Sequence, residues 1–187
     1  MKLFKKLAAA ALAAVLALSM VGCGAGSKGG TSTASELANV LVDMIGEREI
    51  SAKHTGEMDN LAAALATSVG KVENAKETEM KNLLKDTTVL QNAGFTAEDL
   101  QNTAYFVSYV ENYKPQSPIT TEEEKFAWMA YQIMNEDHLQ NVGKLTNLGN
   151  VDELELGAGT VKIGDTEYIV VVAKSVETPA PDTTTKD

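Results

Sequence analysis

The chain is poor in the residue types on which many folds and active sites depend. Its 187 residues include one cysteine, Cys23, two histidines, His54 and His138, and one tryptophan, Trp128. A single cysteine excludes an intramolecular disulfide. We therefore expect any folded domain outside the cytoplasm to be stabilised by its apolar core alone.

Basic residues are also scarce. The chain has 16 lysines and arginines against 26 aspartates and glutamates. Three of the basic residues, Lys2, Lys5 and Lys6, lie in an N-terminal segment that we expect to be removed, which leaves 13 against 26 and a net charge of −13. So acidic a protein lacks the basic surface that nucleic acid requires and is repelled by an anionic membrane surface. We expect no nucleic-acid partner.

The N-terminal segment predicts export and lipidation. Three lysines are followed by the apolar segment Leu7 to Val21, which is too short for a comfortable membrane span, so residues 1–22 are predicted to be a signal peptide for the general secretory pathway. The segment ends in Ser19-Met-Val-Gly-Cys23, which resembles the bacterial lipobox. The alternative is an ordinary signal peptide with a chance cysteine. We expect Cys23 to carry the acyl chains (palmitate) of a lipoprotein anchored on the outer face of the bacterial cell membrane.

Composition divides the remainder into a tether, one domain and a tail. Residues 23–34 contain the lipidated cysteine followed by a run dominated by Gly, Ser and Thr, which predicts a flexible tether that spans on the order of 20 Å. Residues 177–187 hold two prolines and three consecutive threonines, and we expect a disordered tail. Residues 35–176 have the usual length of a single domain.

The segment from Glu153 to Ser175 predicts a β-hairpin with its turn at Gly164-Asp165. Residues 168–173 are continuously apolar and rich in β-branched side chains, so the second strand is expected to be buried on both faces. In the first strand the apolar positions change from even to odd numbers partway along. We expect a β-bulge near Gly157 or Gly159 to cause this change.

Helical patterns upstream of the hairpin predict helices that can cover both faces of such a strand. A first helix is predicted behind a possible capping box of Thr33 and Glu36, with its apolar residues starting at Leu37 and its end at about residues 48–50. Residues 58–85 are predicted to form one long helix or two shorter ones. Residues 103–110 are rich in β-formers and predict another strand. Thr121 is expected to cap a helix that buries Phe126, Met129, Ala130 and Ile133. The order of elements predicts an α+β fold, an αβα sandwich with a small, mostly antiparallel sheet covered by helices on both faces.

Several short motifs occur in an order that resembles a known family. These are Gln101-Asn102-Thr-Ala-Tyr, Trp128-Met-Ala-Tyr131, His138-Leu-Gln-Asn141 and Gly157-Ala-Gly159. Together they resemble the CAP superfamily, the cysteine-rich secretory and pathogenesis-related proteins, over residues 37–174. The resemblance implies an αβα sandwich and a central ligand-binding cleft. The residues expected to line that cleft are Gln101, Asn102, Trp128, Tyr131, His138 and Asn141. Trp128 and Tyr131 form a stripe beside the core face of their helix, and the alternative is that they are packing residues.

The positions at which the chain departs from the family pattern determine whether the expected cleft can bind a metal. CAP proteins often carry two histidines and two acidic residues in this cleft, and here His138 matches one histidine. Gln101 stands where the first glutamate would be, and Tyr131 occupies a position that is acidic or Ser in relatives. One nitrogen without a carboxylate cannot hold a divalent metal, which takes three or four ligands. We therefore expect no metal and no cofactor.

Other chemical patterns are weaker. Ser68-Val-Gly-Lys71 matches the Ser-x-x-Lys of penicillin-binding enzymes, but the companion motifs are missing, which favours a chance match. The acidic residues at 152, 153 and 155 lack the spacing of a calcium loop and are interpreted as a solvated strand start. His54 is expected to be exposed and without a role in a polar loop between helices. His138 is either a cleft residue or a helix C-cap.

Two functional hypotheses remain. The first is a lipoprotein whose degenerate CAP-like domain is a non-catalytic binding or interaction module for a small apolar ligand, a peptide or an envelope protein. The alternative is a hydrolase that acts on envelope polymers, with His138 as general base and an acidic partner. The loss of polar residues from the expected cleft favours the first hypothesis.

Overall fold

A computed structural model describes residues 32–75, 79–101, 104–112, 118–134, 139–142 and 151–176. The signal peptide, Cys23 and the C-terminal segment 177–187 lie outside these residues. No helix in the described part of the chain is long and apolar enough to cross a membrane. The helices are α2 (Thr33–Gly46), α3 (Gly56–Gly70), α4 (Met80–Leu83), α5 (Thr87–Asn92), α6 (Ala97–Gln101) and α7 (Glu122–Ile133). The strands are β1 (Ser51–His54), β2 (Tyr105–Glu111), β3 (Gln140–Val142), β4 (Glu153–Ile163) and β5 (Thr166–Val176).

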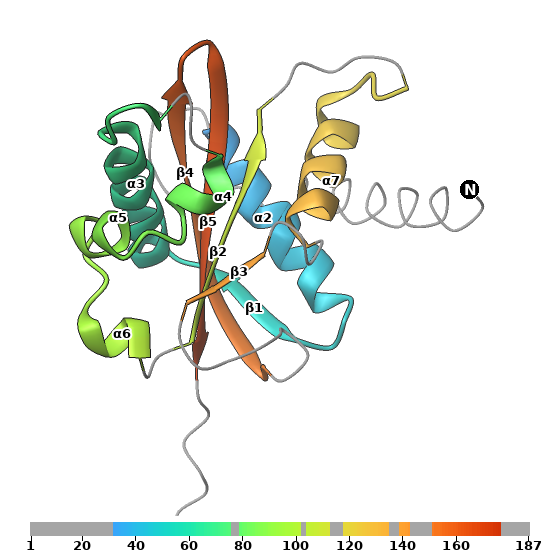
Figure 1. Cartoon of the computed structure of the whole chain (residues 1–187). Coiled ribbons are helices and arrows are strands. Elements are labelled where there is room, and N and C mark those ends of the chain that lie inside the picture. The colour runs from blue at the N-terminus through green and yellow to red at the C-terminus, as the bar shows by residue number, and fades with distance from the viewer. Residues whose placement is uncertain are drawn as a thin grey trace, which may run out of the picture.

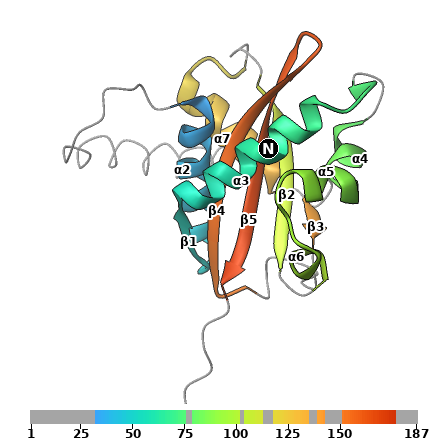
Figure 2. The same ribbon diagram turned by 90° about the vertical axis from the view of Figure 1, so that its left-hand side faces the viewer.

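The five strands form one mixed sheet in the order β1-β4-β5-β2-β3. Only the β1–β4 pair is parallel, and the three other pairs in this sheet are antiparallel. Helices α2 and α7 cover one face, and α3, α4 and α5 cover the other (Figures 1 and 2). The predicted α+β class and the sandwich with a mostly antiparallel sheet are confirmed.

Strand β5 lies at the centre of the sheet and is buried on both faces, as its apolar run predicts. Ile169, Val171 and Ala173 belong to the core beneath α2 and α7, whereas Val170 and Val172 belong to the core beneath α3, α4 and α5. The hairpin turn lies at residues 164–165, and Gly164 adopts a φ of 65°, which glycine tolerates without strain. The predicted hairpin is confirmed.

The predicted bulge in β4 is wrong. Strands β4 and β5 pair without interruption from Glu153–Val176 to Ile163–Thr166. The apolar positions change parity because different helices cover the two faces along the strand: Leu154 and Leu156 face α2 and α7, and further along the odd-numbered positions face α3. The glycines of β4 allow α3 to pack closely on the strand. A methyl group on Gly157 would lie 2.2 Å from the backbone nitrogen of Asp59, and so α3 packs directly on the backbone of β4.

Local signals predict the start of α7 and the end of α3. The capping box of α7 is present, with Thr121 as N-cap and Glu124 as its partner, and α3 ends at Gly70, so residues 58–85 form more than one helix. The N-cap of α2 is Ser32, one residue before the predicted cap Thr33, so the helix begins within residues assigned to the tether. Strands β1 and β3 and helix α5 are additional elements that the sequence did not predict.

Candidate functional site

The structure separates two groups of the predicted cleft residues. Gln101 is exposed at the end of α6, a helix that packs its Leu100 against the core beneath α3. Helix α7, with Trp128 and Tyr131, lies on the opposite face of the sheet (Figure 2). Asn102, His138 and the side chain of Asn141 lie outside the described residues. The cleft as a whole therefore stays a prediction, but Gln101 lies away from the aromatic pair.

Trp128 and Tyr131 form a stacked pair on α7. They are three residues apart and so are neighbours on the helix surface. Their ring centroids are 5.8 Å apart with an interplanar angle of 19°. Tyr131 is 43% exposed, and in the described part of the chain it is the only large hydrophobic residue that is exposed. Such a pair presents an apolar surface with polar atoms at its edge.

Acidic side chains border this pair. Glu124 lies four residues before Trp128, on the same stripe of α7, and the exposed Glu123 precedes it in the first turn of the helix. The Glu124 carboxylate accepts hydrogen bonds from the backbone N–H groups of Thr120 (2.9 Å) and Thr121 (3.2 Å), which lower its pKa and keep it ionised. We call the surface formed by Glu123, Glu124, Trp128 and Tyr131 the α7 aromatic face.

The one basic residue of α7 does not contribute positive charge to the helix surface. Lys125 is only 6% exposed. Its Nζ lies 3.3 Å from a carboxylate oxygen of Glu122 and 5.4 Å from the centroid of the Phe126 ring. Because its charge is buried and paired, the exposed charge of α7 is acidic.

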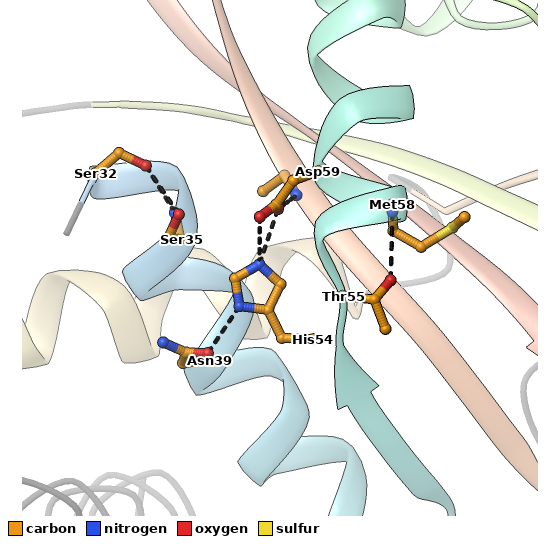
Figure 3. Close-up of polar contacts among 8 residues, drawn as sticks. Ser32, Ser35, Asn39, His54, Thr55, Met58 and Asp59 are labelled. Atoms are coloured by element: carbon orange, nitrogen blue, oxygen red, sulfur yellow. Dashed lines mark hydrogen bonds and ion pairs between the residues drawn. The ribbon is translucent and has the colours of Figure 1, made fainter. Parts of the chain in front are cut away.

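A second polar cluster joins α2, β1 and α3, and it corrects the prediction for His54. His54 lies at the end of β1, not in a loop, and its side chain is only 19% exposed. Its Nδ1 lies 2.9 Å from Oδ1 of Asn39, and its Nε2 lies 2.8 and 2.9 Å from the carboxylate oxygens of Asp59 (Figure 3). The sequence did not reveal this cluster because the contacting residues come from three elements, one of them unpredicted.

The geometry of the His54 cluster indicates a structural role, in which it holds neighbouring elements together. Asp59 Oδ1 also accepts a hydrogen bond from the backbone N–H of Ala158 at 2.9 Å, just beyond the point where β1 stops pairing with β4. Both ring nitrogens of His54 face an amide or a carboxylate, whereas a general base needs a nitrogen directed at a hydroxyl, a thiol or a water. The cluster therefore fastens the edge of the sheet to two helices.

Two further patterns have structural explanations. Ser68 is buried and donates a hydrogen bond to the carbonyl oxygen of Val89 (2.7 Å), so it is not available as the nucleophile of a Ser-x-x-Lys site. Glu153 and Glu155 lie 2.9 and 3.0 Å from the Nζ of Lys53 on the neighbouring strand. Among the residues that the structure describes, no group of three or more His, Cys, Asp or Glu side chains is placed to hold a metal ion.

An apolar cavity lies between α2, α7 and the sheet. Its volume is about 30 Å³, which is far below the roughly 150 Å³ of an apolar cavity that admits benzene. It is therefore too small for an organic ligand unless the core rearranges. The residues that line it include Leu41, Ile45, Phe106, Ile133, Leu156 and Val171.

No protein-family model, no curated protein and no solved structure matches this chain. The resemblance to the CAP superfamily therefore rests on the order of the sequence motifs and stays a prediction. Functional inference depends on the geometry described above, and of the surfaces described it is the α7 aromatic face that combines exposed aromatic area with a single sign of charge.

Proposed function

We propose that this protein is a lipid-anchored extracytoplasmic protein whose domain is a non-catalytic interaction module, and that the α7 aromatic face binds another protein of the envelope. The observation that carries the proposal is the stacking of Trp128 on Tyr131 with Tyr131 43% exposed. Trp and Tyr are enriched among the residues that dominate protein interfaces, because they bury a large area at a low cost in side-chain entropy.

The choice of an interaction module over an enzyme follows from how the polar groups are used. His54 and Asp59 hold one another, Asn39 and the edge of β4. The buried hydroxyl of Ser68 is bound to a carbonyl group. In each case the polar atoms complete contacts within the fold, so they support a structural role.

The choice of a protein partner over an apolar ligand enclosed between α2, α7 and the sheet follows from the size of the cavity there. The apolar cavity of about 30 Å³ does not admit an organic molecule, whereas a helix face can contact a flat partner surface without any cavity. For the domain itself, we infer a divergent CAP-like module. The layered α+β architecture and the order of the motifs support that inference.

The proposal is tested by site-specific crosslinking. A photo-reactive phenylalanine analogue placed at Tyr131 in living cells should give a discrete crosslinked adduct with an envelope protein. The matched control places the same analogue at Glu98, an exposed residue of α6, where no adduct of that size is expected. Equal adduct patterns at the two positions, or none at Tyr131, would contradict the proposal.

A further inference from the structure

The helical layer that contains the α7 aromatic face has an uneven distribution of charge. Helices α2 and α7 lie side by side on one face of the sheet (Figure 1). The sequence of α2 contains no lysine or arginine, and the single lysine of α7 is buried. Exposed acids on these two helices include Glu36, Glu122 and Glu123. The layer therefore offers carboxylates and an aromatic pair, with no exposed basic side chain from the helices themselves.

Two carboxylates also lie near one another at the C-terminal end of α2. Partial burial and the nearby carboxylate of Glu47 raise the pKa of Asp43.

We infer that the partner bound by the α7 aromatic face is a basic, arginine-containing peptide segment of another protein. This inference rests on the proposed function and names the chemistry of the partner. An arginine guanidinium is planar and stacks on aromatic rings, where the ring face attracts positive charge. Glu124 lies on the same stripe of α7 as the two rings, and the exposed Glu123 precedes it in the first turn of the helix. Carboxylates near an interface steer a basic partner and pair with it.

Other occupants fit this surface less well. A second copy of the chain would place acids against acids. An anionic polymer or membrane would meet the same repulsion. A purely apolar peptide would contact the rings but would have to desolvate the neighbouring carboxylates without pairing them. A basic segment satisfies both features of the surface.

The test uses the fluorescence of Trp128, which is the only tryptophan of the chain and lies in the proposed interface. The full-length chain in neutral detergent is titrated with a short peptide of alternating arginine and glycine, and separately with a peptide that has glutamine in place of each arginine. The arginine peptide should change the Trp128 emission saturably, and higher salt should weaken its binding because the charges are screened. The glutamine peptide should leave the emission unchanged.

Variants locate the binding. Tyr131→Ala should weaken the arginine peptide about tenfold, as truncation of an interface aromatic does, and Tyr131→Phe should retain most of the affinity. Glu123→Gln should weaken binding about threefold and reduce its salt dependence. The matched control Glu98→Gln, on α6, should bind as the unchanged chain does. Melting curves of all four variants confirm that each is folded.

Three results would overturn the inference. They are equal binding of the two peptides, wild-type affinity in the Tyr131→Ala variant, and a concentration-dependent change in Trp128 emission without any peptide, which would indicate self-association. If an adduct still forms from position 131 in cells, the proposed function stands and only the basic partner is wrong. If that adduct is also absent, both proposals fail.

Discussion

At the scale of single residues, Asp59 makes the largest number of distinct connections in the His54 cluster. Its carboxylate contacts His54 from β1 and accepts the N–H of Ala158 from β4, while its own backbone belongs to α3. A buried or half-buried acceptor that satisfies two donors is costly to remove, because both donors then lose their partner. Asp59 therefore stabilises the fold in a way that a single hydrogen bond would not.

Replacing Asp59 tests this role. Asp59→Ala should lower the free energy of unfolding by about 1–3 kcal/mol, because the N–H of Ala158 and the ring of His54 are left unsatisfied. The control is Asn60→Ala, which changes the adjacent, exposed position and should alter stability by no more than about 0.5 kcal/mol. Urea denaturation of both variants provides the comparison. Equal stability of the two variants would show that the His54 cluster does not stabilise the fold.

Replacing Asp43 should stabilise the domain, whereas replacing Asp59 should destabilise it, and the effect at Asp43 should depend on pH. Burial and the charge of Glu47 raise the pKa of this carboxyl, so its ionised form is less favourable in the folded chain than in the unfolded chain. The penalty is absent below the unfolded pKa, grows as pH rises through the folded pKa, and is complete above it. Asp43→Asn should therefore stabilise the domain near pH 7 and have little effect near pH 3. A gain of the same size at both pH values, measured by denaturation, would contradict this cause.

At the scale of elements, the close packing of α3 on β4 depends on two glycines of the strand. Gly157 and Gly159 both face α3, and a Cβ atom on either would lie less than 3 Å from its backbone. The helix therefore sits closer to the strand than side chains would normally allow. This close approach also brings Asp59 within hydrogen-bond distance of Ala158.

A glycine substitution measures how strict this contact is. Gly157→Ala should destabilise the domain by about 3 kcal/mol or more, because its methyl group meets backbone atoms that cannot move independently. Gly46→Ala is the matched control. Nothing lies within 4 Å of a Cβ there and the position is helical, so stability should stay constant or rise by about 0.5 kcal/mol. Similar melting temperatures for the two variants would mean that α3 can move away from β4 at little cost.

Elements with a strong local pattern were predictable, and short ones were not. The buried apolar run of β5 and the Thr121 cap of α7 can each be recognised from a few consecutive residues. Strand β1 has four residues and β3 has three, too few for a period of two to be recognised. The absence of β1 from the prediction also hid the His54 cluster, because Asn39 and Asp59 meet His54 only when that strand is placed. Trp128 and Tyr131 were found by resemblance to a family cleft, and the structure places Gln101 on the other face of the sheet.

At the scale of the whole molecule, we expect a domain held to the membrane by lipid and not by its acidic surface. Cys23→Ser should leave the folded domain intact while the chain leaves the membrane fraction or stalls before signal-peptide removal, because no acyl chain can be attached. Labelled fatty acid and fractionation of cells report the outcome. Incorporation of label into the Cys23→Ser chain would show that the lipobox interpretation is wrong.

The central claim is that the α7 aromatic face is covered by a partner in the cell envelope, and hydroxyl-radical footprinting tests it most directly. Labelling of Trp128 and Tyr131 is compared between intact cells and the purified full-length chain, with the half-buried Tyr168 as internal reference. If a partner covers this face, labelling of Tyr131 relative to Tyr168 falls several-fold in cells. An unchanged ratio would mean that the exposed pair has no partner there, and the claim would be contradicted.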